Sequence, residues 1–303
     1  MKEISPSVIE NFKNEFLQKI AEVSGECLEE SSSLEQYTAL SEMVMEKTAA
    51  YWASTSSQYA SNPHKRVYLF SIEFLIGRLL KSYLASLDLV PVVKTVFSDL
   101  GLDYTNILDQ EADPGLGNGG LGRLMACFLE SSATLGFPFH GNGIHYKHGL
   151  FKQLLINGEQ VEVADNWLEH GYPFEIKKPK ESVIIKYYGR VHSEKINGQL
   201  TFVYDDYEAI RAMPYDIPVK GYRNKTVNSL RLWSAEPMES FDLSCFNEGQ
   251  FLDAVRHKSE AEAISQVLYP NDDQFRGKAF TREPLSLLAK QHLVIILPKR
   301  LSG

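Results

Sequence analysis

The chain has 303 residues, of which 44% are hydrophobic, and a formal net charge of −8. This length suffices for one large core or two smaller ones, and the acidic balance without a basic stripe argues against nucleic acid as a partner. The three cysteines, Cys27, Cys127 and Cys245, are far apart and form no Cys-x-x-Cys motif, which is typical of free thiols in a reducing cytoplasm. No apolar run approaches the length of a membrane span, and the first residues lack the apolar core of a signal peptide. We therefore expect a cytoplasmic protein.

The first 60 residues predict two helices. Ser5 precedes Pro6, a pair typical of a helix cap followed by the first helical position. Apolar residues then recur at helical spacing, at Ile9, Phe12, Phe16, Ile20 and Val23. A second helix is predicted from about Ser33 to Tyr59. Further on, the apolar run 67–72 predicts a buried strand and residues 79–87 predict a helix.

A glycine-rich stretch over residues 113–123 is the most informative feature of the chain. Five glycines fall within the eight positions 115–122, and a run of periodic apolar residues follows until Gly136. This pattern predicts a glycine-rich loop that opens an amphipathic helix. Backbone N–H groups can approach an anion closely in such a loop, and the positive end of the helix dipole favours the same negative charge. The stretch therefore predicts a site for a phosphate or a sugar.

Two other interpretations of this loop stay open at the level of the sequence. The glycines can serve a tight turn that needs several positive φ angles. Gly115-x-Gly117-x-x-Gly120 also spells the dinucleotide-binding fingerprint, which should follow a buried strand and precede an acidic residue about 20 positions on. The preceding residues 107–114 are acidic and unlike a strand, and residues 135–146 contain no Asp or Glu. A nicotinamide or flavin enzyme is therefore disfavoured.

The second half of the chain predicts mainly strands. Residues 144–153 and 161–163 have the pattern of sheet segments, and residues 182–188, 190–193 and 200–204 alternate as strands do. Asn197-Gly198 is a typical hairpin turn between the last two. Residues 246–266 predict a helix. The mixture indicates an α/β fold with an antiparallel addition in the middle.

Several blocks of the chain resemble the glycogen and α-glucan phosphorylases. The first block is Glu111 to Arg123 with its continuation Ala126 to Ser131, and the second is Tyr68 to Arg78. The others follow in family order: Ala164 to Gly171, Ala212 to Val219, Gly221 to Asn224 with Arg231 to Ala235, and Val267 to Asp273. Together they cover about residues 60–278, and the chain is identified as a member of this family.

The resemblance implies a fold and an activity. Family members have two Rossmann-like lobes in the glycosyltransferase-B arrangement, and this chain resembles an incomplete N-terminal lobe. We expect an N-terminal helical region at residues 1–60 and the partial lobe at 61–278. The family cleaves terminal α-1,4-linked glucose with phosphate, which gives glucose 1-phosphate with retained configuration. It uses pyridoxal phosphate, whose phosphate group exchanges a proton with the substrate phosphate, and its members are usually homodimers.

The resemblance also assigns roles to residues. It implies that Asn118, Gly119 and Gly120 begin the helix whose N–H groups face the two phosphates, and that Leu121 touches the glucose. Asp272 and Asp273 fall on the family's gate loop, where many members carry Asn at the position of Asp273. We further expect Glu73 and Arg123 to form a buried charge pair behind the loop, because a buried Arg needs a partner.

The same resemblance implies which functional groups belong to the second lobe and are absent from this chain. The main catalytic groups, the phosphate-binding basic residues and the Lys that anchors pyridoxal phosphate belong to the second lobe, and their motif is absent here. His140, His145 and His148 cluster in the sequence, but no Cys or acid joins them at a recognised metal spacing, so we expect no metal site. Trp167 and Trp233 are expected to be core aromatics.

The resemblance ends near residue 278. We expect residues 279–303 to be an aberrant tail, produced by a shift of reading frame near codon 280, with a natural short variant as the alternative. The chain alone is then expected to be inactive as a glycogen, starch or maltodextrin phosphorylase. A stand-alone carbohydrate-binding or interaction fragment without catalysis is the alternative function.

Overall fold

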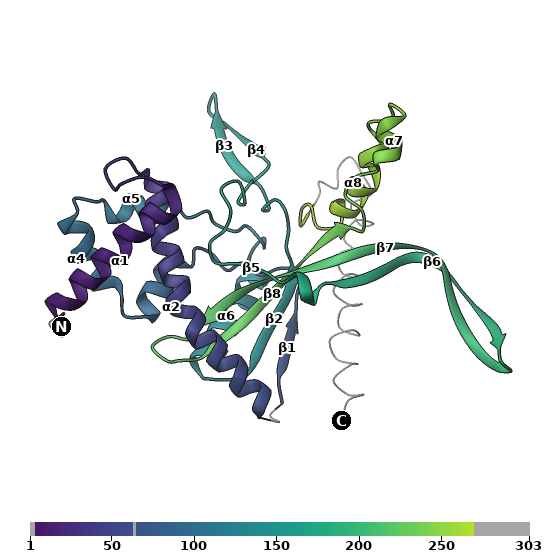
Figure 1. Ribbon diagram of the computed structural model, residues 1–303, viewed down its shortest axis with the longest axis horizontal. Coiled ribbons are helices and arrows are strands. Elements are labelled where there is room, and N and C mark those ends of the chain that lie inside the picture. Colours follow the sequence, from purple (N-terminus) through teal and green to yellow (C-terminus); the bar gives the residue numbers. More distant parts are fainter. Residues whose placement is uncertain (1–3, 63–64, 270–303) are drawn as a thin grey trace. The chain divides into compact units, whose positions relative to one another are not determined.

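A six-stranded sheet runs through the computed structural model, which describes residues 4–62 and 65–269 (Figure 1). Its hydrogen-bonded order is β1-β2-β8-β7-β5, and β6 pairs with β7. The strands are β1 (Val67–Phe70), β2 (Phe139–Ile144), β5 (Ile176–Lys177), β6 (Val183–Ile196), β7 (Gln199–Lys220) and β8 (Val227–Pro237). β1 and β2 are parallel, whereas β6 and β7 are antiparallel. The predicted α/β class with an antiparallel addition is confirmed.

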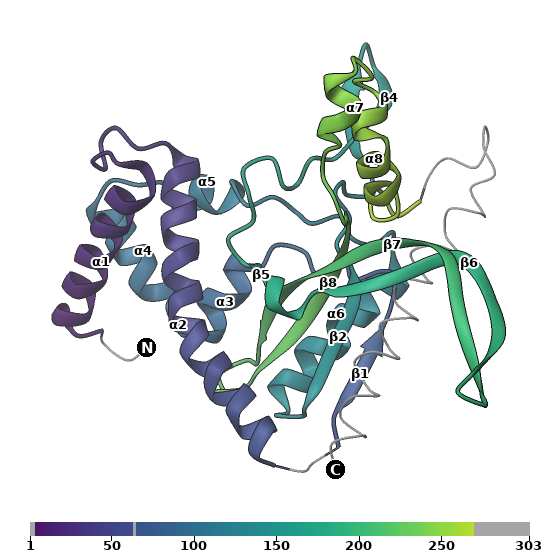
Figure 2. The same ribbon diagram turned by 45° about the vertical axis from the view of Figure 1, so that its right-hand side comes forward.

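Two long helices begin the chain as predicted. α1 spans Pro6–Ser24 and α2 spans Ser33–Ser61, and the two lie side by side in Figures 1 and 2. Phe12, Phe16 and Ile20 of α1 are buried at the predicted helical spacing. The start of α2 is fixed by a capping box: the Ser32 hydroxyl accepts the Glu35 N–H, while the Glu35 carboxylate accepts the Ser32 N–H at 2.7 Å.

The parallel pair β1 and β2 is joined by a long crossover. It contains α3 (Leu80–Ser86), α4 (Val90–Asp99), α5 (Tyr104–Asp109) and α6 (Gly120–Thr134). Parallel strands need such a connection because the chain must return to the same end of the sheet. Val67 is 50% exposed and Tyr68 to Phe70 are half-buried, so the prediction of a buried strand over 67–72 is wrong in its burial. β1 is the last strand of the described sheet, and one of its sides has no described neighbouring strand.

The middle of the chain forms hairpins. The turn at Asn197-Gly198 has positive φ at both residues, 52° and 81°, as the predicted hairpin turn requires. A second hairpin joins β3 (Lys152–Ile156) to β4 (Glu159–Val163). The strand predicted over 144–153 is displaced: β2 ends at Ile144 and β3 begins at Lys152.

The helix predicted over 246–266 is broken into three shorter pieces. These are α7 (Leu243–Asn247), the 3₁₀ turn η2 (Asp253–Val255) and α8 (Arg256–Ala263). Gly249 lies between the first two with φ of 81°, a value that a helix interior does not allow. None of the helices in the described part of the chain is both long and apolar enough to cross a membrane.

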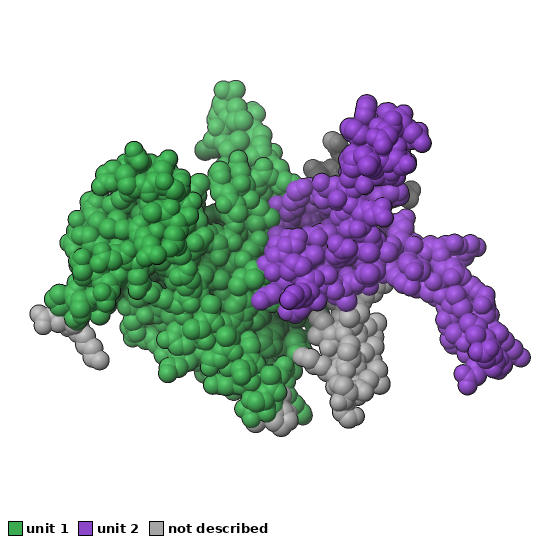
Figure 3. All heavy atoms as spheres, viewed as in Figure 1, with its two compact units in different colours: residues 1–142, 148–176, 216–231 green, residues 143–147, 177–215, 232–303 purple. Residues whose placement is uncertain are grey.

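The chain divides into two compact units, which Figure 3 colours separately. Unit 1 contains residues 1–142, 148–176 and 216–231, and unit 2 contains 143–147, 177–215 and 232–303. The glycine-rich loop, α6 and the two N-terminal helices all belong to unit 1. The proposed division at residues 60 and 278 follows the family resemblance and stays a prediction, and residues 279–303 lie outside the described residues.

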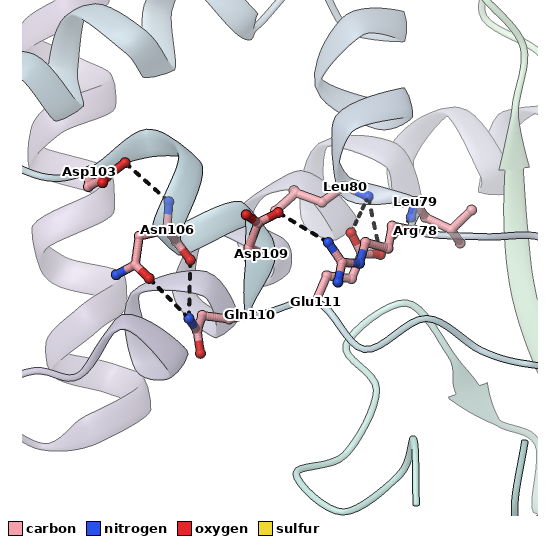
Figure 4. Close-up of polar contacts among 8 residues, drawn as sticks. All are labelled: Arg78, Leu79, Leu80, Asp103, Asn106, Asp109, Gln110 and Glu111. Atoms are coloured by element: carbon pink, nitrogen blue, oxygen red, sulfur yellow. Dashed lines mark hydrogen bonds and ion pairs between the residues drawn. The ribbon is translucent and has the colours of Figure 1, made fainter. Parts of the chain in front are cut away.

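A buried carboxylate ties the segment before the loop to α3. Glu111 is 2% exposed, and its Oε1 accepts the Leu79 N–H at 2.5 Å while its Oε2 accepts the Leu80 N–H at 3.1 Å (Figure 4). These donors lie at the start of α3, where no intrahelical acceptor exists for them. Burial raises the pKa of Glu111 to about 7, against the lowering effect of the two N–H donors. Nearby, the exposed pair Arg78 and Asp109 lies 3.1 Å apart.

We predict that Glu111 makes stability depend on pH. Its folded pKa, about 7, lies above the value of 4.5 for an unfolded Glu, so its stabilising contribution is complete below pH 4.5 and is lost as pH rises through 7. Glu111→Gln removes this titration. The free energy of unfolding of the variant, relative to wild type, should therefore rise by up to ~3 kcal/mol between pH 4 and pH 8. Urea unfolding at both pH values measures this difference, and two parallel pH profiles would contradict it.

Candidate functional site

The glycine-rich loop ends at the exposed start of α6. The helix begins at Gly120 after Gly119, whose φ of −173° is extended backbone that any residue can adopt. None of the glycines at 115, 117, 119, 120 and 122 has positive φ, although Gly136 after the helix does, at 75°. The interpretation of this loop as a tight turn with several positive φ angles is therefore wrong.

Three of the loop glycines are required by close packing. A Cβ at Gly117 would lie 3.0 Å from the Leu75 Cβ, and one at Gly122 would lie 2.9 Å from Oε2 of Glu73. A Cβ at Gly115 would lie 3.1 Å from the Leu150 N atom. Such distances leave no room for a side chain unless neighbouring atoms move.

The other two loop glycines face open space. A Cβ at Gly119 or Gly120 would meet no atom within 4 Å, and neither residue has a backbone conformation that needs glycine. Nothing among the described residues therefore explains glycine at these two positions. A ligand, or polypeptide outside the described residues, that approaches the backbone closely does explain it.

Free backbone donors lie at the same two glycines. The N–H groups of Gly119, Gly120 and Leu121 have no acceptor in the part of the chain that the structure describes, as is usual at a helix start without a cap. All three residues are exposed. The helix dipole adds partial positive charge at this point, so the geometry can bind a phosphate or another anion.

Asn118 contributes to this site in a different way than expected. Its N–H donates to Oε2 of Glu73 at 3.1 Å, so this donor is turned into the protein rather than toward a ligand. Asn118 itself is exposed, as are Gly119 and Gly120, and Leu121 is 73% exposed. Of the predicted phosphate-facing set, Gly119 and Gly120 therefore offer free N–H groups and Asn118 does not. Asp272 and Asp273 lie outside the described residues.

The structure corrects the expected pair between Glu73 and Arg123. Glu73 is buried beneath the loop, but Arg123 has a half-exposed side chain whose guanidinium lies 3.6 Å from Glu130. Its other nitrogen donates weakly, at 3.4 Å, to the carbonyl oxygens of Leu75 and Ile76. Both residues lie beside the loop, yet they do not form a buried ion pair, because the Arg123 guanidinium is directed to Glu130 and to the carbonyl oxygens of Leu75 and Ile76.

A second carboxylate, that of Asp165, lies near the loop, since a Cβ at Gly115 would be 3.4 Å from its Oδ2, and sequence reasoning did not single it out. Gly149 donates its N–H to the Asp165 carbonyl at 2.9 Å, and Leu150 donates to the Gly115 carbonyl at 2.9 Å. A Cβ at Gly149 would overlap the Asp165 carboxylate, whose pKa is raised above its ordinary value by burial. Asp165 was visible within the matched block 164–171, but only its contact with Gly149 reveals the supporting role.

Two of the clustered histidines stack on aromatic rings, and both singled-out tryptophans lie in the core. His140 stacks on Tyr68 with ring centroids 5.7 Å apart, and the buried His145 stacks on Tyr215 at 4.2 Å. In the described ranges, no three His, Cys, Asp or Glu side chains are grouped as metal ligands. Trp167 and Trp233 are 3% and 1% exposed, which confirms them as core aromatics.

The surroundings of the loop also bear on the dinucleotide fingerprint. The element before the loop is the short helix α5, and residues 110–119 contain no strand. The fingerprint requires a strand at that place, since its pyrophosphate binds between a strand end and a helix start. The interpretation as a nicotinamide or flavin site is therefore excluded by the structure.

We predict opposite effects of alanine at two neighbouring glycines. Gly122→Ala should destabilise unit 1 by ~1–3 kcal/mol, because its Cβ would press on a carboxylate that the Asn118 N–H already holds. Gly120→Ala meets no atom and replaces glycine in a helix, so stability should be unchanged or rise by up to ~1 kcal/mol. Denaturant unfolding of both variants measures this, and equal losses would show that the packing argument is incorrect.

Comparison with known proteins identifies relatives of this chain. The model of the carbohydrate phosphorylase family matches residues 97–284, which extends past the expected end of the resemblance at 278. Glycogen phosphorylase of Bacillus subtilis (strain 168) is 42% identical over 269 residues, or 89% of this chain and 33% of that protein. The brain form of glycogen phosphorylase from Rattus norvegicus is 45% identical over 242 residues, or 80% of this chain and 28% of that protein.

These relatives show which family the chain belongs to and how much of a full-length member it spans. The chain spans about a third of the length of the curated relatives it matches. The match covers more than the expected region 60–278, since 89% of the chain aligns with the Bacillus protein. The mixed α/β fold with its parallel strand pair agrees with part of a phosphorylase lobe. The chain belongs to the carbohydrate phosphorylase family.

Proposed function

We propose that this chain is the part of an α-glucan phosphorylase that presents the glycine-rich loop to phosphate. The complete enzyme would transfer the terminal α-1,4-linked glucose of glycogen, starch or maltodextrin to inorganic phosphate. In that reaction the glycosidic C1–O bond breaks, a phosphate oxygen bonds to C1, and the shortened glucan takes up a proton. The products are glucose 1-phosphate and the shortened glucan.

One observation carries this proposal. The free N–H groups of Gly119, Gly120 and Leu121 lie at the exposed start of a 15-residue helix, and nothing among the described residues requires glycine at 119 and 120. A phosphoryl group is the ligand class that such a helix start fits best, because its oxygens accept several N–H bonds and its charge opposes the dipole. Membership of the carbohydrate phosphorylase family supports phosphorolysis as the reaction.

Pyridoxal phosphate fits this part of the site only through its phosphate. The exposed N–H groups at 119–121 can donate hydrogen bonds to a phosphate oxygen, and we assign Gly119 and Gly120 to this contact. When bound, the cofactor supplies a phosphate group that exchanges a proton with the substrate phosphate. The residues of this chain orient that phosphate and keep the loop rigid, and the lysine that anchors the cofactor is expected in the second lobe.

Three further assignments accompany the proposal. Leu121, which is 73% exposed beside the free donors, would touch the glucose. Asp272 and Asp273 would belong to the gate loop beside it. Glu73 would act as a positioning residue, since its carboxylate holds Asn118 and lies against Gly117 and Gly122.

The proposed setting is a cytoplasmic homodimer. The three cysteines are free, as expected for a reducing compartment. Dimers are implied by the family alone. The alternative, a carbohydrate-binding or interaction fragment without catalysis, makes different demands, because it requires glucan binding by this chain in the absence of the other lobe.

We predict that this chain alone releases no glucose 1-phosphate from glycogen and phosphate, and that a chimera does. In the chimera, the matched region of this chain replaces its counterpart in the Bacillus subtilis relative. Phosphorolysis depends on positioning two phosphates across a cleft, and one wall cannot do so. Glucose 1-phosphate is measured by coupled assay, with the Bacillus enzyme as control. A folded chimera without activity would refute the proposed function, whereas turnover by the chain alone would refute the claim that one wall of the cleft is insufficient.

We also predict a phosphate-specific effect of Gly120→Ala in the active chimera. The added Cβ is tolerated by the fold but obstructs the approach of an anion to the helix start. The KM for phosphate should rise about tenfold or more, which corresponds to ~1.4 kcal/mol, while the KM for glycogen changes less. Leu155→Glu, an 84% exposed position on β3, is the matched control. An unchanged KM for phosphate would remove Gly120 from the site.

A further inference from the structure

Four Asn-Gly sequences occur in this chain, at Asn118, Asn142, Asn157 and Asn197. In such a sequence the backbone nitrogen of the glycine can attack the side-chain carbonyl carbon of the asparagine, because glycine has no Cβ to obstruct the approach. The reaction releases the side-chain amide as ammonia and replaces a neutral residue by a charged one. The surroundings of the four asparagines differ, and they decide which of them reacts.

Asn142 is protected by the sheet. It is 3% exposed in β2 and pairs with Phe70 of β1, and its carbonyl accepts the Ser71 N–H at 3.1 Å. Attack by the Gly143 nitrogen requires rotation about the bond between Cα and C of Asn142. This rotation would break the pairing with β1, so we expect no reaction at this position.

The two hairpin asparagines are exposed, but their turns keep the reacting groups apart. Asn157 and Asn197 have φ of 54° and 52°, and the glycines that follow them have φ of 84° and 81°. In this left-handed conformation the nitrogen of the next residue lies on the side of the Cα–C bond that faces away from the side chain. Strand pairing of β3 with β4 and of β6 with β7 closes the two turns and resists rotation out of this conformation.

Asn118 has neither form of protection. It is exposed, its φ is not positive, and it precedes the extended Gly119, whose N–H has no acceptor in the described part of the chain. A Cβ at Gly119 would meet no atom within 4 Å, so the space beside this nitrogen is open. The hydrogen bond from the Asn118 N–H to Glu73 lies on the other side of Cα and is kept during rotation about the Cα–C bond. The Gly119 nitrogen can therefore turn toward the Asn118 side chain.

The start of α6 favours the reaction electrostatically. The attack removes the proton of the Gly119 N–H and places negative charge first on this nitrogen and then on the side-chain oxygen of Asn118. The partial positive charge at the start of a helix stabilises both. The free N–H groups of Gly120 and Leu121 lie two and three residues beyond Asn118, a spacing at which asparagine oxygens commonly accept backbone N–H groups. They can donate to the oxygen as its charge develops, as the donors of an oxyanion hole do.

We propose that Asn118 is a site of spontaneous deamidation and that this modification closes the anion site at the start of α6. The Gly119 nitrogen forms a bond to Cγ of Asn118 and gives up its proton. The bond between Cγ and the side-chain nitrogen breaks, and ammonia leaves with that proton. Water then opens the resulting succinimide ring at either carbonyl, which gives aspartate or isoaspartate at position 118.

Either product changes the candidate site. An aspartate carboxylate at position 118 brings negative charge to the donors that a phosphate needs, and it can itself accept the N–H of Gly120 or Leu121. Isoaspartate adds a methylene group to the backbone, which shifts the loop relative to Glu73. This consequence rests on the proposed function. The deamidation itself does not, because it needs only the residues at 118–121.

Peptide mass mapping tests the modification on the full chain. The purified chain is incubated at mildly alkaline pH, and the deamidated fraction, which is about 1 Da heavier, is followed at all four asparagines. Asn118 should react about tenfold faster than Asn157 and Asn197, and Asn142 should stay unmodified. A hairpin asparagine that reacts as fast as Asn118 would overturn the proposal, and so would the absence of any reaction at position 118.

Gly119→Ala identifies the attacking nitrogen. The added Cβ meets no atom of the described structure but stands beside this nitrogen, so deamidation at Asn118 should slow about tenfold. The rates at the two hairpins should stay the same, and thermal unfolding checks that the fold is kept. Gly120→Ala, the same substitution one residue on, is the matched control and should leave the rate at Asn118 near its wild-type value. Equal slowing in both variants would contradict attack by the Gly119 nitrogen.

Asn118→Asp in the Bacillus subtilis chimera tests the effect on the anion site. The KM for phosphate should rise about tenfold while the KM for glycogen changes less, because the new carboxylate competes for the free donors. Asn157→Asp makes the same charge change at the tip of the β3–β4 hairpin and should leave both constants unchanged. An unchanged KM for phosphate in Asn118→Asp would show that deamidation does not close the site. If the unsubstituted chimera is inactive, the proposed function fails, and the mass map still decides the deamidation.

Discussion

The close approach of the Glu73 carboxylate to Gly117 and Gly122 is the contact on which the candidate site depends. It fixes where the segment after β1 meets the start of α6, because Asn118 donates to the same carboxylate and the Leu75 N–H donates to the Gly122 carbonyl at 3.0 Å. Because this carboxylate lies so close to the backbone at both positions, glycine is needed at 117 and at 122. The free N–H groups at 119–121 are thereby held in place by the contacts that Glu73 and Leu75 make with the loop and the helix start.

The sequence located the elements that local patterns specify. α1 and α6 were predicted because each has helical apolar spacing and a cap or stop residue, and α2 was predicted from apolar spacing alone. The turn at Asn197-Gly198 was predicted because its residues tolerate positive φ. The prediction of one continuous helix over 246–266 was wrong. The apolar periodicity continues across Gly249, although the helix breaks there. Apolar spacing also identified α6 but not which of its faces is buried.

The glycines located the candidate site in the sequence. Only the structure shows which of them close packing requires and which face open space. Five glycines in the sequence look equivalent, and only the surrounding atoms distinguish the three that packing requires from the two that face open space. The same holds for Arg123, whose partner is Glu130, seven residues on, and not Glu73. Glu111 and Asp165 stood in matched blocks, but their burial depends on segments far along the chain. Such long-range contacts leave no signal in a single sequence.

The two faces of α6 explain why the loop and the rest of the fold are inseparable. Gly122, Ala126, Leu129 and Ala133 are buried within unit 1, and this packing positions the helix start together with the contacts of Glu73. The opposite stripe, Leu121, Leu124, Phe128 and Leu135, is 43–73% exposed, so burial among the described residues accounts for its apolar character only in part. Glycine at 119 and 120 has no cause there either. Both features adjoin at Leu121, which follows the two glycines directly and is itself 73% exposed.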